Sequence, residues 1–236
     1  MPWEAIERCQ TDDVIERAHW EEAQVVEMFG EFQPANASAR QRRIEEGLRG
    51  LFPQTLGDRR QTYRLGFDVA ASGRGSLSVF YIDRVAGEEL RLAALLTCRT
   101  QDWHFLKSAL MVFLRNLANV RACGDETGLG RQICWEAAKE CPWAFKPVNF
   151  SGEKTALGFE LMNQLALGRK RFPRAAAEVA ADYFALHKRN TAGHWSFTES
   201  PNPLNAASHC DIAWAGALAS RAHATAPCPV FAMVMG

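Results

Sequence analysis

The sequence predicts an α/β fold in which a mixed sheet, made of a three-stranded antiparallel meander and additional parallel strands, is flanked by helices. Three apolar runs at residues 64–70, 77–82 and 90–97 follow one another with short glycine-containing segments between them, as in a meander. Helix and strand patterns then alternate, as in units that add parallel strands. The 236 residues are 47% hydrophobic and 23% charged, which indicates a globular protein with a substantial core.

The first 60 residues have a different texture from the rest. Residues 1–32 hold nine acidic residues and two arginines, and their apolar spacing predicts a helix with Thr11 as its candidate N-cap. Pro, Asn and Ser predict a loop at 33–38, and a short helix at 40–51 ends near Gly50 and Pro53. We therefore expect a helical leader or linker at 1–60 and an α/β domain at 61–236.

After the meander, the remaining elements are expected in a regular order. An amphipathic stretch at 103–117 predicts a long helix, and a short strand follows at 119–123. A helix then begins after Gly130, followed by a strand at 145–150 and by helices at 153–167, 174–187 and 208–223.

Composition excludes several classes of protein. The formal net charge is zero, so any contact with nucleic acid must come from a local patch. The seven cysteines form no CxxC pair and no spacing typical of a metal site, which indicates a reducing, cytoplasmic environment. No signal peptide is recognisable, and the longest apolar stretches are far shorter than the roughly 20 residues that cross a bilayer, so a membrane-spanning role is excluded.

Asp68 stands in the middle of an apolar strand, where an unpaired carboxylate is costly. Arg64 shares its face but is too far along the strand for a close pair. A bound cation is one explanation. The other is a core aspartate that accepts bonds from backbone amides or from a distant arginine.

Two further aspartates are candidates for the same site. Asp125 follows a strand and begins a glycine-rich turn, at the strand end where open α/β sheets place their sites. Asp211 falls in the first turn of the last predicted helix, which Ser208 is expected to cap and whose small residues allow close packing on the sheet. Each has a plainer alternative, a turn residue for Asp125 and a helix-start acid for Asp211.

Together the three aspartates predict a metal site. They lie on two strands and one helix that the predicted fold packs together, and close carboxylates repel unless hard divalent cations offset their charge. Two such ions about 4 Å apart activate water on one side of a phosphodiester and stabilise the leaving oxygen on the other, which is nuclease chemistry.

The ordered motifs resemble the C-terminal nuclease domain of the large terminase of tailed phages, across about residues 60–222. Those motifs are GFDVA at 66–70 with Ser78-Val79 after its turn, DETGLG at 125–130, NFSGEK at 149–154 and HCDIA at 209–213. The leader, with its Gly30-Glu31-Phe32 ending, resembles the segment that joins motor and nuclease domains in such proteins.

The resemblance implies an RNase H-like fold, with Asp68, Asp125 and Asp211 as the metal-binding catalytic residues and two Mg²⁺ or Mn²⁺ ions as cofactors. It implies a metal-dependent endonuclease that cuts concatemeric phage DNA during genome packaging. The implied partners are double-stranded DNA, the terminase ATPase domain, the small terminase and the portal, in the host cytoplasm.

The sequence departs from the family pattern in two places. Ser76 stands where an acidic residue often follows the first strand. No G-x-x-x-x-G-K-[ST] motif is present, so the ATPase half is missing and the chain is an isolated domain, a split gene product or a remnant.

Basic residues provide candidate DNA contacts, with a solvated surface as the alternative. They are Lys154, a run of Arg169, Lys170, Arg171 and Arg174, and the pair Lys188 and Arg189 before an aromatic segment. His209 is either a neighbour of the metal site or a surface residue.

Three other functions share some of these sequence features. An actin-like or sugar-kinase-like ATPase shares the strand, aspartate and glycine turn but needs two duplicated halves, for which 236 residues are too few. A non-catalytic packaging or DNA-docking module accounts for the missing motor and for Ser76. A junction resolvase or transposase-like nuclease shares the acidic strand and the acidic terminal helix.

Overall fold

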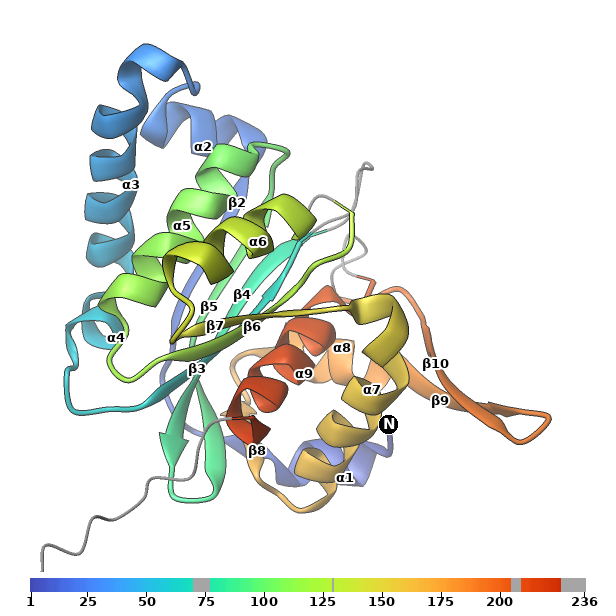
Figure 1. The fold of residues 1–236 in the computed structure, drawn as a ribbon. Coiled ribbons are helices and arrows are strands. Elements are labelled where there is room, and N and C mark those ends of the chain that lie inside the picture. The colour runs from blue at the N-terminus through green and yellow to red at the C-terminus, as the bar shows by residue number, and fades with distance from the viewer. Residues whose placement is uncertain (70–76, 129, 205–208, 226–236) are drawn as a thin grey trace, which may run out of the picture.

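The computed structural model describes residues 1–69, 77–128, 130–204 and 209–225. Within these residues an eight-stranded mixed sheet is covered by helices on both faces, which confirms the predicted fold class (Figure 1). None of the described helices is long and apolar enough to cross a membrane.

The predicted meander is present and forms the middle of the sheet. It consists of β3 (Tyr63–Asp68), β4 (Ser78–Ala86) and β5 (Glu89–Arg99), paired antiparallel in that order. Beyond β3 lie β6 (Arg121–Asp125) and β7 (Phe145–Val148), which continue the sheet in parallel. Beyond β5 lies β8 (Lys170–Pro173), also parallel. The strands β3, β5 and β6 therefore all end at one edge of the sheet.

Each face of the sheet has its own hydrophobic core, because strand side chains alternate between the two faces. Phe67 and Phe80 belong to one core and Val79 and Tyr81 to the other. The first core is covered by α2 (Glu22–Phe29), α3 (Ala37–Leu51), α4 (Pro53–Gly57), α5 (Trp103–Asn116) and α6 (Gly130–Glu140). The second is covered by α1 (Trp3–Arg8), α7 (Phe150–Ala166), α8 (Ala177–Ala185) and α9 (Asp211–Ala224).

The prediction of a helix beginning after Thr11 is wrong. Thr11 ends a short strand, β1 (Gln10–Thr11), which pairs with β8, and the next segment is β2 (Glu16–Glu21), which pairs in parallel with β5. The segment of β2 carries only one fully buried side chain, Trp20, so its apolar pattern was too sparse to reveal a strand. Residues 1–60 therefore contribute two strands, β1 and β2, to the sheet as well as helices.

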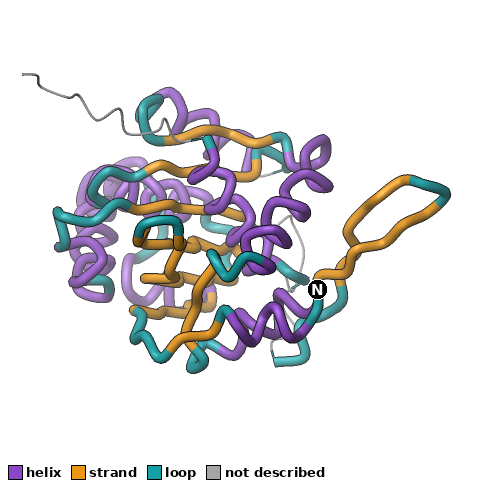
Figure 2. Tube along the Cα trace, turned by 90° about the horizontal axis from the view of Figure 1, so that it is seen from below, coloured by secondary structure: helices purple, strands orange, loops and turns teal. Residues whose placement is uncertain are grey.

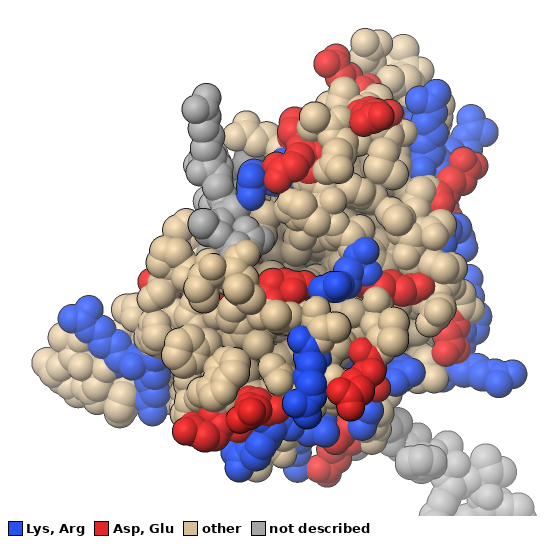
Figure 3. Space-filling model, turned by 180° about the vertical axis from the view of Figure 1, so that it is seen from behind, with Lys and Arg blue, Asp and Glu red and all other residues tan. Residues whose placement is uncertain are grey.

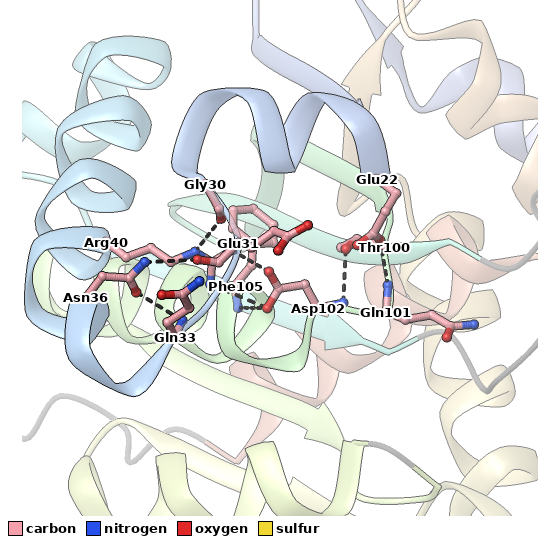
Figure 4. Close-up of polar contacts among 10 residues, drawn as sticks. All are labelled: Glu22, Gly30, Glu31, Gln33, Asn36, Arg40, Thr100, Gln101, Asp102 and Phe105. Carbon is pink, nitrogen blue, oxygen red and sulfur yellow. Dashed lines mark hydrogen bonds and ion pairs between the residues drawn. The ribbon is translucent and has the colours of Figure 1, made fainter.

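A buried ion pair fastens the segment between α2 and α3 to the sheet domain (Figure 4). Arg40 of α3 binds Asp102, the residue that caps α5 by accepting the backbone N–H of Phe105 at 2.9 Å. The same guanidinium donates to the carbonyl of Gly30 at 2.8 Å. The loop predicted at 33–38 is shorter than expected: it contains a short 3₁₀ turn, η1 (Pro34–Asn36), and α3 already begins at Ala37.

The helix predicted at 174–187 is shorter than expected, and a hairpin follows it. After α8 the chain forms β9 (Leu186–Thr191) and β10 (His194–Glu199), an antiparallel ribbon that extends away from the body in both views (Figures 1 and 2). Ala192 and Gly193 form its two-residue turn with φ values of 51° and 85°, as a type I′ turn requires. Most residues of these two strands are polar, so the sequence shows no alternation of apolar and polar residues that would predict a hairpin.

Candidate functional site

Asp68 and Asp125 lie side by side at the edge where the parallel strands β3 and β6 end. Phe67 pairs with Gly124 in the parallel register, and the two aspartates are the next residues of each strand. Strand spacing places the two backbones about 5 Å apart. The residues are 9% and 7% exposed, so both carboxylates are largely removed from water.

Asp211, the first residue of α9, reaches the same edge from the helix layer. Its Oδ2 accepts the backbone N–H of Leu77 at 3.1 Å and that of His209 at 3.3 Å. Leu77 directly precedes β4, where Val79 pairs with Asp68. The exposed His209 therefore contributes a backbone donor to this carboxylate.

Burial raises the pKa values of all three carboxyl groups, and repulsion from the other two adds to this effect at Asp68. The pKa of Asp68 lies well above its usual value because the group is buried and because the charges of Asp211 and Asp125 oppose its ionisation. Burial raises the pKa of Asp211 to about 6. Burial also raises the pKa of Asp125, although hydrogen bonds from Thr127 favour its ionised form. The three groups thus form one electrostatic unit.

The donor chemistry of this unit suits a hard cation, because it consists of carboxylate oxygens. The described residues contain no group of three His, Cys, Asp or Glu side chains already arranged as metal ligands. Asp125 is held instead by Thr127, whose hydroxyl lies 2.8 and 2.7 Å from the two carboxylate oxygens. A cation would have to draw the carboxylates together.

Glycine lets α9 lie directly on β3, as its small residues predicted. A Cβ atom at Gly66 would lie 1.7 Å from the carbonyl oxygen of Ala215 and 2.6 Å from the nitrogen of Ala219. A Cβ atom at Gly216 would lie 2.6 Å from the hydroxyl of Tyr183 on α8. These two close approaches fix the helix that begins with Asp211.

The start of α9 depends on a residue that sequence reasoning missed. The predicted cap, Ser208, lies outside the described residues, and the residue before the helix, Cys210, has φ 65° and no capping hydrogen bond from its side chain. Asp182 of α8, fully buried, accepts the backbone N–H of Ala213 at 2.9 Å and a bond from the side chain of Asn202 at 2.9 Å. An acid on the buried face of an apolar helix was the available signal.

Replacing Asp182 by alanine is expected to destabilise the protein by about 2–4 kcal/mol, because buried donors of Ala213 and Asn202 lose their acceptor. Asp182→Asn keeps one amide oxygen as acceptor and should lose less. Urea unfolding of the two variants measures the difference. Equal stability of Asp182→Ala and the wild type would contradict the assigned capping role.

The predicted DNA contacts separate into three groups. Lys170 is excluded, because its side chain is fully buried and its Nζ donates to Asp83 at 2.5 Å and to the carbonyl of Gly216 at 2.9 Å. Arg169 and Arg171 flank it in a part of the sheet far from the aspartates. Leu90 pairs with Lys170 and stands seven positions before Thr97, the residue of β5 that is level with Asp68, which is a distance of about 23 Å.

These two arginines are also balanced by acids. Arg169 lies 2.6 Å from Glu88 and Arg171 lies 3.9 Å from Glu89, while Arg174 lies 3.4 Å from the exposed Asp12. Figure 3 shows basic and acidic side chains next to one another toward its lower edge. Such mixed surfaces give no single-signed field for a phosphate backbone.

The remaining candidates lie nearer the acidic edge or project from the body. Lys154 is on α7, whose first residue, Phe150, donates its backbone N–H to Asp125. Lys188 and Arg189 are exposed on β9 of the hairpin. The Lys188 ammonium lies 4.0 Å from the centroid of the Trp195 ring, so the charged end of this side chain is held against the ribbon.

The central strand order β5-β4-β3-β6-β7, with α9 as the last described helix, agrees with the RNase H-like fold expected from the sequence. Among solved structures, the chain is similar to the large terminase nuclease of thermophilic phage G20c with bound magnesium, at TM-score 0.56 and 18% identity over 70% of this chain and 82% of that one. The same nuclease with bound cobalt gives 0.53 and 20% over 69% and 81%. The large terminase nuclease domain of Thermus phage P74-26 gives 0.52 and 17% over 67% and 78%.

No family model and no curated protein matches the sequence. The structural similarity shows the fold, which is that of large terminase nuclease domains.

Proposed function

We propose that the chain is a metal-dependent DNA endonuclease that cuts concatemeric phage DNA during genome packaging. The observation that carries this proposal is the electrostatic unit of Asp68, Asp125 and Asp211 at the carboxyl edge of a terminase-nuclease fold. The cofactor would be Mg²⁺ or Mn²⁺, bound as two ions. A bound divalent ion activates water and offsets the charge that develops on a phosphodiester.

The residues of this chain have distinct tasks in that reaction. Asp68, next to Asp125 on the neighbouring strand and repelled by both other acids, would hold the cations together with those two residues. Thr127 orients Asp125, and the backbone N–H groups of Leu77 and His209 orient Asp211. Packing around Asp68 limits the access of water to its carboxylate. The attraction between this carboxylate and a cation is therefore screened less.

The substrate would be double-stranded DNA, contacted near the acidic edge by Lys154 and at a distance by Lys188 and Arg189. Exposed lysine and arginine side chains bind phosphates without reading sequence. The ATPase domain of a large terminase, the small terminase and the portal are the proposed partners, and the host cytoplasm is the proposed location.

Nicking of supercoiled plasmid tests the proposal. With Mg²⁺ or Mn²⁺ the protein should convert supercoiled DNA to open-circular and linear forms, and EDTA should stop the reaction. DNA binding without metal-dependent cleavage would support the non-catalytic docking module instead. A strong preference for branched over linear duplex DNA would support the resolvase alternative.

Metal binding should stabilise the protein in a pH-dependent manner. Because the pKa of Asp211 is raised to about 6, the folded state holds this proton more tightly than the unfolded state. The resulting stabilisation is present below the unfolded value near 4 and is lost as pH rises through about 6. Mn²⁺, which binds the ionised groups, reverses this loss only where they are ionised.

We therefore expect Mn²⁺ at 100 times its Kd to raise Tm at pH 8 by about 5–10 °C. At a fixed Mn²⁺ concentration the shift should become much smaller at pH 5. Thermal unfolding followed by circular dichroism at the two pH values measures it. A shift of the same size at both would show that the aspartates are not the ligands.

A further inference from the structure

Glu199, the last residue of β10, links the base of the hairpin to both helices beside the acidic edge. Its Oε1 accepts the ammonium of Lys154 on α7 at 2.5 Å and the indole N–H of Trp214 on α9 at 2.8 Å. The Glu199 side chain is 28% exposed, so water screens these contacts only in part.

Lys154 is held on more than one side. Its Nζ lies 5.4 Å from the centroid of the Phe150 ring and 5.2 Å from that of Trp214, and these two rings meet edge to face with centroids 4.9 Å apart. Such cation–aromatic contacts favour one position of a flexible side chain. Lys154 stands one helical turn after Phe150, the first residue of α7, whose backbone N–H bonds Asp125, so the ammonium lies on the helix that begins beside that carboxylate.

Trp214 gives Glu199 a second connection. It stands three residues after Asp211 in α9, so its indole N–H fixes the Glu199 carboxylate relative to the start of that helix. One carboxylate oxygen of Glu199 thus contacts Lys154 of α7 and Trp214 of α9, the two helices that begin beside the acidic site.

The hairpin base that carries Glu199 is itself fixed by packing. Phe197 of β10 lies against Gly158 of α7, where a Cβ atom would come within 2.5 Å of the ring. Phe159 meets Phe197 and Trp195 edge to face, with ring centroids 5.4 and 6.4 Å away. The position of Glu199 therefore follows from the seating of the hairpin on α7.

We propose that Glu199, anchored by the indole of Trp214, is a positioning residue for DNA cleavage: it holds Lys154 where its ammonium contacts a phosphate beside the acidic site. This inference rests on the proposed nuclease function. Glu199 itself touches neither the phosphate nor the cations. Lys154 makes the contact, and Glu199 acts through it.

The test is a double-mutant cycle on plasmid nicking with Glu199→Ala, Lys154→Met and the combined variant. Glu199→Ala is expected to lower kcat about tenfold and to change KM for DNA less than threefold. If Glu199 acts through Lys154, the combined variant should be no worse than Lys154→Met. Glu199→Gln, which keeps an acceptor for Trp214 but loses the charge, should fall between Glu199→Ala and the wild type.

Glu88→Ala is the matched control, because Glu88 also pairs with a basic residue, Arg169, but its side chain is 78% exposed. It should leave kcat unchanged. A second readout does not depend on activity: the indole N–H resonance of Trp214, assigned with Trp214→Phe, should shift in Glu199→Ala and stay nearly in place in Glu88→Ala.

Losses that add in the combined variant, or an unshifted Trp214 resonance in Glu199→Ala, would overturn the proposal for Glu199. So would a fully active Glu199→Ala. A wild-type protein that fails to nick DNA with either Mg²⁺ or Mn²⁺ would instead overturn the nuclease function itself, so the two failures are distinguishable.

Discussion

Asp68→Asn is expected to reduce metal-dependent nicking by at least about 10³-fold, which is the largest functional effect of any single change in this chain. The substitution keeps size and hydrogen-bonding capacity but removes the charge next to Asp125 and opposite Asp211. Without that charge, the site would lose one of the three carboxylates that would hold the cations. Time courses of supercoiled plasmid with Mn²⁺ measure the loss.

The fold should survive this change. Because burial and repulsion raise the pKa of Asp68, ionisation at neutral pH destabilises the metal-free protein, and asparagine removes that cost. The metal-free variant should unfold at the same temperature as the wild type or above it. Asp12→Asn, at a side chain that is 93% exposed, is the control and should nick normally. Undiminished nicking by Asp68→Asn would refute the assignment of the site.

Gly66→Ala should have the largest effect on stability. The added Cβ atom would lie 1.7 Å from a backbone oxygen of α9 and 2.6 Å from a backbone nitrogen, and neither can move without moving the helix. We expect the free energy of unfolding to fall by about 3 kcal/mol or more. Cleavage should fall as well, because displacing α9 displaces Asp211.

Gly50→Ala is the matched control for this prediction. Gly50 lies in α3, and a Cβ atom there meets nothing within 4 Å. Alanine should stabilise the helix by up to about 1 kcal/mol. Urea unfolding of both variants gives the comparison, and wild-type stability of Gly66→Ala would show that α9 does not depend on this close approach.

The sheet could be predicted because its signals are local. The strands β3, β4 and β5 are apolar runs of strand length separated by short turns, and α5 has a strong helical period. The position of Asp68 and Asp125 follows from a general rule, since parallel strands end at a common edge. Applying this rule requires only the order of strands and helices along the chain, which the sequence patterns indicate.

Pairings distant in sequence account for what could not be predicted. Lys170 resembled a surface cation, yet its partner, Asp83, stands 87 residues away. Asp182 caps α9 by accepting a bond from a residue that lies 31 positions later in the sequence. The strand β2, at residues 16–21, pairs with residues 94–99 of β5. Such contacts form only in the packed fold. The pattern of residues within a short stretch of sequence therefore does not reveal them.

The most direct measurement is anomalous diffraction from crystals of the protein grown or soaked with Mn²⁺. The account predicts manganese peaks beside Asp68, Asp125 and Asp211, two of them about 4 Å apart, with carboxylate oxygens as ligands. A map from Mn²⁺-saturated crystals with no peak at these three carboxylates would contradict it.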